Sequence, residues 1–257
     1  MTLAAPEKPP TVGAAPAGTR DQQTAAQAVR EMFTAIAPRY DLLNHLLSLN
    51  VDRLWWWRAA RTFRHILARP EVRVLDLCCG TADMALAARR VSSNSATIFG
   101  ADFSHAMLVR AAGKAPGRVR LMEADALCLP VGDARFDLVV SAFGFRNLAD
   151  YDAGLREIFR VLCPGGEVGI LDFGEPKGVL GRIYRVYFRR ILPVVGTIVS
   201  GVRGPYAYLP ASVESFPGPS QMLERMRATG FQDVSWTPYT FGIAGLYRGK
   251  RPLRVRL

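Results

Sequence analysis

Cysteine and histidine are scarce in this sequence of 257 residues, which contains four cysteines and three histidines. Cys78 and Cys79 are adjacent, whereas Cys128 and Cys163 stand alone. Four cysteines are too few for a disulfide scaffold in a chain of this length, and the C-x-x-C spacing of zinc and redox sites does not occur. No two histidines lie four residues apart. We therefore expect neither a disulfide framework nor a metal site built on histidine.

Long apolar runs are missing as well. A bilayer-spanning helix needs about 18 or more apolar residues, and the longest candidate, ILPVVGTIVSGV, is interrupted by Pro193, Gly196 and Gly201. Residues 1–24 are rich in Ala, Pro, Gly and Thr and have neither a basic start nor an apolar run. This composition predicts a disordered tail and excludes a signal peptide. We expect a cytoplasmic protein, either soluble or peripheral on the inner face of the cytoplasmic membrane.

Acidic residues are absent from three stretches of the chain. Residues 53–70 contain five arginines, residues 176–213 contain six basic residues, and five more follow from Arg248 to the end. The whole chain has 33 Lys and Arg against 22 Asp and Glu, a net charge of +11. The excess positive charge is therefore local, which indicates a surface that meets an anionic partner. Membrane headgroups, nucleic acid and an ordinary solvated face all remain open at this point.

The hydrophobic fraction of 49% is sufficient for a full core. Residues 25–69 are predicted to be helical, and short apolar runs then alternate with helical patterns. Strands are predicted over 72–79, 96–102, 118–125, 136–143 and 166–173, and helices over 84–91, 104–115 and 152–162. This alternation is typical of a doubly wound, Rossmann-like α/β fold with a parallel sheet.

The C-terminal part of the chain follows a different pattern. A basic, aromatic helix is predicted over 180–192 and another helix over 220–231, and two strands over 233–241 and 243–250 are joined at Phe241-Gly242. The closing hairpin predicts a seven-stranded sheet, mostly parallel, with one antiparallel strand. We expect a single domain over 25–249, composed of a helical N-terminal cap (25–69), a cofactor-binding core (70–175) and an insertion facing substrate or membrane (176–219), with a basic tail at 250–257.

The segment VLDLCCGTAD (74–83) lies where open α/β sheets bind their ligands, just beyond the end of a strand. Gly80 permits a sharp turn and a close approach of the ligand. A dinucleotide loop would need G-x-G-x-x-G, but alanine stands at positions 82 and 85. A nucleoside without phosphates therefore fits this loop better than a dinucleotide does.

Carboxylates are predicted at or near the ends of three successive strands, at Asp76, Asp102 and Asp125. Asp102 follows Gly80 by 22 residues, where an acid accepts hydrogen bonds from ribose hydroxyls. Asp125 is placed to accept from an adenine amino group. The alternative is that all three carboxylates merely cap strand ends.

Four segments together make the chain resemble a known family. They are FTAIAPRYDLLNHLLSLNVDRLWW (33–56), VLDLCCGTADMA (74–85), SAFGFRNLAD (141–150) and REIFRVLCPGGEVGILDFGEP (156–176). They resemble motifs of the class I S-adenosylmethionine-dependent methyltransferases, and more closely those of the ubiquinone/menaquinone biosynthesis C-methyltransferases, the UbiE/MenG family. The resemblance covers about residues 29–249. Departures from the family pattern include Asp52 in place of His, Ala82 in place of Gly and Asp172 in place of Glu.

The resemblance implies an enzyme that uses S-adenosyl-L-methionine to methylate a ring carbon of a prenylated quinol. It places the cofactor among Gly80, Thr81, Asp102, Asp125, Ala126 and Ser141, and it places Tyr40, Arg146 and Asn147 at the active centre. No metal is implied. Methylation of another small molecule or of RNA, and a non-catalytic scaffold that binds the cofactor, are the alternatives.

The chemistry suggests a role for each residue of the active centre. A quinol that loses a proton develops an oxyanion, and Arg146 and Asn147 are suitable donors to it. Arginine is a poor base because its pKa stays above about 12. Tyr40 is suited to hydrogen-bond a ring oxygen. The alternative roles are a core aromatic for Tyr40 and a salt bridge for Arg146.

The isoprenoid tail implied by the resemblance accounts for the basic, aromatic stretch 180–203. Its aromatic and aliphatic side chains would line an apolar groove, while its arginines would meet lipid phosphates. The apolar set is Tyr184, Tyr187, Phe188, Ile191 and Leu192, and the basic set is Arg182, Arg185, Arg189 and Arg190. The expected partners are thus a prenylated quinol and an anionic membrane, without nucleic acid. A homodimer is left open.

Overall fold

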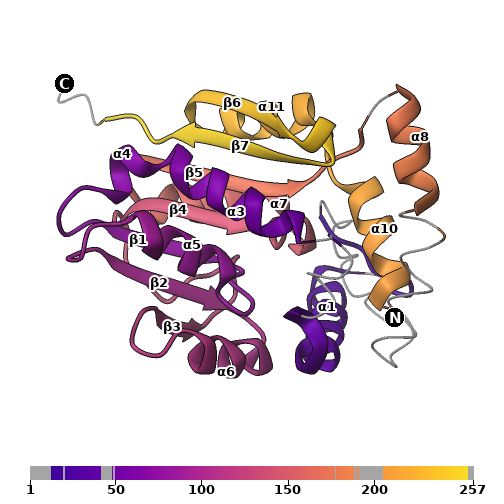
Figure 1. Cartoon of the computed structure of the whole chain (residues 1–257), viewed down its shortest axis with the longest axis horizontal. Helices are drawn as coiled ribbons and strands as arrows, with labels where there is room; N and C mark the ends of the chain where they lie inside the picture. The colour runs from indigo at the N-terminus through magenta and orange to yellow at the C-terminus, as the bar shows by residue number, and fades with distance from the viewer. Residues whose placement is uncertain are drawn as a thin grey trace, which may run out of the picture.

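A seven-stranded sheet forms the centre of the fold (Figure 1). The computed structural model describes residues 13–19, 21–41, 48, 50–176, 178–187, 190 and 205–253. The strands are β1 (Arg73–Leu77), β2 (Thr97–Asp102), β3 (Arg120–Glu123), β4 (Phe136–Ala142), β5 (Leu162–Phe173), β6 (Gln232–Tyr239) and β7 (Ala244–Lys250).

The strands lie in the order β3-β2-β1-β4-β5-β7-β6. The first five strands along the chain pair in parallel, whereas β7 is antiparallel to both β5 and β6. The predicted α/β class, with its doubly wound, mostly parallel seven-stranded sheet and one antiparallel strand, is therefore confirmed. The strand order reverses between β1 and β4, so the loops after these two strands diverge and leave room for a ligand.

Helices cover both faces of the sheet. They are α1 (Gln22–Ile36), α3 (Val51–Thr62), α4 (Arg64–Leu67), α5 (Asp83–Val91), α6 (His105–Lys114), α7 (Tyr151–Val161), α8 (Gly178–Val186), α10 (Pro205–Ser215) and α11 (Pro219–Thr229). Short 3-10 turns lie at Ala37–Arg39, Phe145–Asn147 and Thr240–Gly242. No helix among the described residues is both long and apolar enough to cross a membrane.

The two faces of the sheet are buried in two separate apolar cores. Alternate residues of a strand point to opposite faces, and accordingly Val74 belongs to one core and Leu75 to the other. The core that contains Val74 lies under α3 and α5, which run in front of the sheet in Figure 1. The core that contains Leu75 lies under α7 and α11. Burial on both faces explains why these strands are continuous apolar runs.

The N-terminal region is ordered from further upstream than its composition predicted. Asp21 caps α1, accepting from the Thr24 backbone N–H at 2.9 Å, and the Thr24 hydroxyl in turn accepts from the Asp21 backbone. The backbone N–H of Ala14 donates to the Leu148 carbonyl at 2.8 Å, and Ala14 is buried. The predicted disordered tail thus fails over 13–19 and 21–24, because a capping box and one buried tertiary contact hold these residues. The remaining residues of the predicted tail lie outside the described part.

Two further boundaries differ from the sequence prediction. β5 begins at Leu162 rather than at residue 166, because Gly165 and Gly166 pair with Arg251 through the backbone and continue the strand. Helix α10 was not predicted at all. Its helical pattern is obscured by Gly204 just before it, Pro205 at its start and Pro210 within it.

Candidate active site

A cleft that is partly open to solvent lies at the carboxyl ends of β1, β2 and β4. It is lined by the loop after β1, the ends of β2 and β4, and residues from the N-terminal helices. Of the predicted site residues, those on its wall are Tyr40, Gly80, Thr81, Asp102, Asp125, Ala126 and Asn147. Two predicted site residues, Ser141 and Arg146, are not among its described lining residues. The structure therefore brings seven of the nine predicted residues together around one cavity.

The loop after β1 turns by means of three residues with positive φ. Cys78, Gly80 and Ala82 have φ of 56°, 52° and 69°. Ala82 occupies a position where the family pattern has glycine, and it adopts the left-handed conformation directly before α5 while fully buried. A left-handed residue other than glycine costs roughly 1–2 kcal/mol. The loop therefore keeps its shape in spite of the alanine.

The cysteines of this loop are not nucleophiles. Burial raises the pKa of both thiols, and the carboxylates Asp76 and Asp102 raise it further. Because the thiolate is the reactive form, Cys78 and Cys79 stay neutral and act as packing residues.

Asp102 supports the turn and also faces the cleft. Its Oδ2 accepts from the Gly80 backbone N–H at 2.8 Å, and its Oδ1 accepts from the Ser104 backbone N–H at 2.9 Å. Burial raises its pKa, and these backbone hydrogen bonds oppose the rise. An ionised carboxylate offers about four acceptor positions, so Asp102 retains capacity for the hydroxyls of a ribose. Asp102 can therefore cap the strand end and bind the ribose hydroxyls at the same time.

Asp76 is the most informative of the three carboxylates. It is buried, its Oδ2 accepts from the Ala85 backbone N–H at 2.8 Å, and its Oδ1 has no hydrogen-bond partner among the described residues. Burial raises its pKa well above the usual value, and Asp102 and Asp83 raise it further. An unpartnered buried carboxylate oxygen is costly unless a ligand donor meets it. Since Asp76 lines the cleft, a positively charged ligand group fits there.

Asp125 completes the set of carboxylates after β3. Its Oδ1 accepts from the Leu127 backbone N–H at 2.8 Å, which forms a tight turn, and the neighbouring Ala126 also lines the cleft. The small side chain of Ala126 leaves room for a flat ring beside the carboxylate. This end of the cleft suits an adenine base.

The hydroxyl of Thr81 belongs to a network of charged groups. It donates to Asp41 Oδ1 at 2.5 Å and lies 3.3 Å from Lys114 Nζ. Lys114 in turn pairs with Asp41 at 3.1 Å and with Asp83 at 2.6 Å. The network ties the cofactor loop to the N-terminal helices and to α6. Thr81 thus contributes to the cleft chiefly by fixing its wall.

Ser141 lies in β4 with its hydroxyl buried and without a hydrogen-bond partner among the described residues. It pairs with Ile170 of β5. The sequence resemblance places it beside the cofactor, and Ser141 is not among the described residues that line the cleft.

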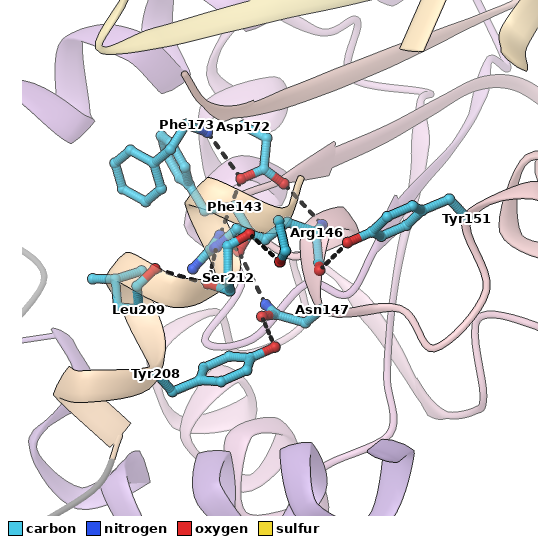
Figure 2. Close-up of polar contacts among 10 residues, drawn as sticks. Phe143, Arg146, Asn147, Tyr151, Asp172, Phe173, Tyr208, Leu209 and Ser212 are labelled. Atoms are coloured by element: carbon cyan, nitrogen blue, oxygen red, sulfur yellow. Dashed lines mark hydrogen bonds and ion pairs between the residues drawn. The ribbon is translucent and has the colours of Figure 1, made fainter. Parts of the chain in front are cut away.

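Arg146 is not among the described residues that line the cleft, and it forms a buried ion pair with Asp172 (Figure 2). Its Nη1 is 3.1 Å from Asp172 Oδ1 and also donates to the Phe143 carbonyl, and its backbone N–H donates to Asp172 Oδ2 at 3.0 Å. Asp172 is fully buried, and its burial raises the pKa of the carboxyl while Arg146 opposes the rise. The guanidinium also lies 5.1 Å from the Phe173 ring. These contacts hold the 3-10 turn Phe145–Asn147 in a fixed position.

Asn147 is the residue of this turn that reaches the cleft. Its Oδ1 accepts from the Tyr208 hydroxyl at 3.1 Å, and its Nδ2 is 3.5 Å from the Phe143 carbonyl (Figure 2). Burial raises the pKa of Tyr208 to about 12, so this hydroxyl remains a donor at neutral pH. With its oxygen held by Tyr208 and one N–H directed at the Phe143 carbonyl, the amide of Asn147 keeps its second N–H for an oxyanion.

Tyr40 lines the cleft beside the glycine turn. A Cβ placed on Gly80 would be 3.8 Å from Tyr40 Cε1, and the ring meets Phe33 edge to face at 6.1 Å. Tyr40 also packs against the small apolar cluster of Ile36, Ala37 and Met107. Both sequence interpretations of Tyr40, as an active-centre residue and as a core aromatic, therefore agree with its position.

Helix α10 supplies two site residues that the sequence analysis missed, Tyr208 and Ser212. Ser212 Oγ lies 3.4 Å from Arg146 Nε (Figure 2). The only signal for them is that tyrosine and serine occur near the end of the basic stretch 176–213. Asp172 was noted as a departure from the family pattern, but nothing in its spacing indicates a partner 26 residues away.

The predicted apolar set on the basic helix is only partly described. Tyr184 on α8 is largely buried, which raises the pKa of its hydroxyl, and Arg146 is close enough to oppose the rise. Arg182 and Arg190 are exposed. The side chains of Arg185, Phe188, Arg189, Ile191 and Leu192 lie outside the described residues.

The fold and the site together define a class of protein. A doubly wound sheet holds, at its switch point, a carboxylate-lined cleft whose loop lacks the glycines for a pyrophosphate, as in class I S-adenosylmethionine-dependent methyltransferases. Among the described residues, no three His, Cys, Asp or Glu side chains are grouped so that they would hold a metal ion.

Comparison with known proteins defines the family. The sequence pattern of the ubiE/COQ5 methyltransferase family matches residues 20–251, and the chain belongs to that family. It is 48% identical over 235 residues to the demethylmenaquinone methyltransferase of Deinococcus radiodurans, covering 90% of this chain and 95% of that one. It is 42% identical over 234 residues to the ubiquinone/menaquinone biosynthesis C-methyltransferase UbiE of Geobacter sulfurreducens, covering 89% and 90% of the two chains.

Solved structures agree at the level of the fold. The [4+2]-cyclase SpnF superposes with a TM-score of 0.66 at 20% identity, covering 95% of this chain and 99% of that one. A Thermotoga maritima methyltransferase described as a possible histamine N-methyltransferase superposes with a TM-score of 0.61 at 18% identity, covering 86% and 98%. Identities this low establish the fold alone.

The chain is thus a methyltransferase that uses S-adenosyl-L-methionine. The cleft fits this cofactor, because an unpartnered oxygen of Asp76 and two further carboxylates match its cationic and hydrogen-donating groups. Gly80, Asp76, Asp102, Asp125 and Ala126 are the residues that would hold it.

Proposed function

We propose that this enzyme methylates a ring carbon of demethylmenaquinol. The observation that carries the proposal is the 48% identity, over 90% of the chain, to the D. radiodurans enzyme named demethylmenaquinone methyltransferase. The T. thermophilus enzyme of the same name is also 48% identical, and 100% of its length is covered. The relatives named UbiE support a benzoquinol ring as the second candidate. No observation favours an RNA substrate.

When bound, the cofactor supplies a methyl group on a sulfonium, which an electron-rich ring carbon attacks. The chain's own contribution is to hold that carbon in line and to stabilise the oxygen that activates it. Positioning alone reaches effective molarities of about 10⁵ M or more. The wall that carries Tyr40 and the wall that carries Asn147 both line the cleft, so a flat ring between them would lie near the cofactor.

Asn147 is the proposed direct donor to the ring oxyanion. Asn147 lines the cleft, its side-chain oxygen accepts from Tyr208 at 3.1 Å and one N–H donates to the Phe143 carbonyl, so the second N–H is left for the ring oxygen. Preorganised donors of this kind contribute about 3–4 kcal/mol to catalysis. Tyr40 is proposed to hydrogen-bond a ring oxygen from the opposite side.

Arg146 is proposed to act as a positioning residue and as a source of positive charge behind Asn147. Asp172 compensates much of that charge, so the Arg146–Asp172 pair fixes geometry more than it supplies a field. Breaking such a buried pair by removing one partner is costly, because the other charge is left uncompensated. This modifies the sequence interpretation, in which Arg146 itself donates to the oxyanion.

The prenyl tail of the substrate is proposed to leave the cleft along α8 and α10. Support comes from Tyr184 and Tyr208, two largely buried tyrosines near Arg146.

Two further proposals concern partners of the protein: contact of the basic stretch 176–213 with an anionic membrane, and a homodimer. Vesicle co-sedimentation and light scattering, respectively, test them.

The decisive experiment offers the purified enzyme both ring types. The protein is incubated with methyl-labelled S-adenosyl-L-methionine and with demethylated naphthoquinol or benzoquinol, kept reduced under anaerobic conditions, and products are identified by mass spectrometry. We expect one labelled methyl on the naphthoquinol ring. Label on benzoquinol alone would replace the substrate assignment, and label on neither ring would overturn the proposal.

A further inference from the structure

A second groove lies on the surface between α3, α5 and the region after α6. It is open to solvent, and its lining includes five basic side chains and one acid, Asp83. Arg53, Arg90 and Arg118 are exposed, and Lys114 lies 2.6 Å from Asp83. The charge of Asp83, the only acid among the described lining residues, is therefore neutralised by Lys114. The groove presents a strong net positive charge to solvent.

Large apolar side chains are exposed on the helix beside this groove. Leu54 and Trp57 of α3 are each 48% exposed. They are three residues apart, so they lie on one face of the helix. The guanidinium of Arg61 lies 4.8 Å from the Trp57 ring. Exposed Arg53, Leu54, Trp57 and Arg61 therefore form one basic and apolar strip, which we call the α3 strip.

We propose that the α3 strip and the adjoining groove dock on an anionic phospholipid bilayer. An indole and a leucine suit the boundary between headgroups and acyl chains, while flanking arginines meet lipid phosphates. The same charges would attract RNA, but Leu54 has no face for base stacking and the face of Trp57 is already covered by Arg61. The observations therefore favour the bilayer.

The position of the groove adds a consequence for the reaction. Trp56 and Asp83 line both the groove and the cofactor cleft, so the two cavities share a wall. Docking through the α3 strip would bring the cleft close to the membrane surface. If the proposed function holds, a substrate with a prenyl tail would then be drawn from the bilayer. Docking itself rests only on the surface and is tested without catalysis.

The test is co-sedimentation of the full chain with vesicles of phosphatidylcholine alone or with added phosphatidylglycerol. We expect binding to the anionic vesicles only, weakened by added salt. Loss of one arginine near a charged surface weakens partitioning by about fivefold. Arg53→Gln and Arg90→Gln should each show this loss. Trp57→Ala should weaken binding while leaving its salt dependence unchanged.

Matched controls separate docking from general charge effects. Arg227→Gln removes the same charge from an exposed position on α11, and it should bind like the wild type. Thermal melting checks that each variant is folded, and methylation of a tail-free quinol should be unchanged in all of them. Binding that does not depend on phosphatidylglycerol, or equal losses in Arg53→Gln and Arg227→Gln, would overturn the proposal. So would tighter binding to duplex RNA than to vesicles at physiological salt.

Discussion

The residues next to Asn147 fix the position of its turn, so substitutions there should alter the active site. Phe143 connects Arg146 and Asn147, because its carbonyl accepts a hydrogen bond from each of them. It also has a positive φ of 59°, and its ring lies tilted against the Phe173 ring with the centroids 4.6 Å apart. A Cβ on the next residue, Gly144, would come within 2.4 Å of Cys78 Cβ, so only glycine fits there. The turn that carries Asn147 is therefore locked against the cofactor loop by contacts that tolerate little change.

Arg146→Ala tests the positioning role. It leaves Asp172 buried without its partner, and we expect turnover to fall by about 10²-fold or more, comparable to loss of a preorganised donor. The affinity for S-adenosyl-L-methionine should change little, because Arg146 is not among the described residues that line the cleft. Steady-state kinetics and calorimetry measure the two quantities. The double variant Arg146→Met with Asp172→Leu should melt at a higher temperature than Arg146→Ala. Equal losses of turnover and cofactor affinity would argue against this role.

Asp76→Asn tests the unpartnered carboxylate. Burial raises the pKa of Asp76, so the folded state binds its proton more tightly than the unfolded state does. This cost to stability is absent below the usual pKa and appears as the pH rises through the raised value. The variant should therefore melt above the wild type at pH 7–8, by about 2–4 °C for each kcal/mol relieved. The difference should disappear near pH 4.

The same variant should lose affinity for the cofactor. A hydrogen bond to a charged group contributes about 1.5–3 kcal/mol, so binding should weaken by about tenfold or more. Calorimetry of cofactor binding provides the measurement, with Asp137→Asn as the control, because this half-buried carboxylate pairs with Arg69 and is not among the described residues that line the cleft. A variant that is more stable but binds the cofactor normally would exclude Asp76 as a ligand.

Elements beyond the sheet decide how the active centre is closed. α10 lies beside the 3-10 turn Phe145–Asn147 in space although about 60 residues separate them in the chain. It brings the Tyr208 hydroxyl to Asn147 and the Ser212 hydroxyl to Arg146. The substrate side of the site therefore depends on a helix outside the cofactor-binding core.

Tyr208→Phe removes the hydrogen bond from this helix to Asn147 and keeps the ring. Loss of a single neutral hydrogen bond costs about 0.5–1.5 kcal/mol, so we expect the turnover number to fall about 3- to 10-fold. The KM for S-adenosyl-L-methionine should stay constant. Tyr239→Phe on β6 is the matched control, because the Tyr239 hydroxyl hydrogen-bonds Thr62 and Tyr239 is not among the described residues that line the cleft. An unchanged turnover number would show that α10 does not orient Asn147.

Strands and helices were predictable to different degrees. Buried strands such as 72–79 and 136–143 show continuous apolar runs, and local patterning alone identified them. α10 escaped because Pro210 interrupts its pattern and its partners lie far away in the chain. The cofactor loop and carboxylates were found because their spacing is local. The Arg146–Asp172 pair was not found, because a long-range ion pair leaves no periodic signal.

At the scale of the whole molecule, the protein combines an acidic cleft with a basic exterior. The cofactor cleft gathers carboxylates at the switch point of the sheet, whereas the excess of positive charge, +11 overall, lies outside it. The cofactor carries positive charge on its sulfonium and ammonium groups. Separation of the two surfaces lets the cleft attract that cofactor while the exterior attracts anions.

Binding of this cofactor should stabilise the entire domain, because the cleft is shared by the N-terminal helices, the loop after β1 and the turn that carries Asn147. A ligand that binds only the folded state at 100 times its Kd adds about 2.7 kcal/mol to the free energy of unfolding. For a chain of this size we expect the melting temperature to rise by roughly 5–10 °C. Differential scanning fluorimetry with S-adenosyl-L-methionine and S-adenosylhomocysteine measures the shift. NAD is the control and should give none, because Ala82 and Ala85 replace the glycines that admit a pyrophosphate. A shift with NAD and none with the two adenosyl compounds would mean that the carboxylate-lined cleft binds a phosphate-bearing ligand instead.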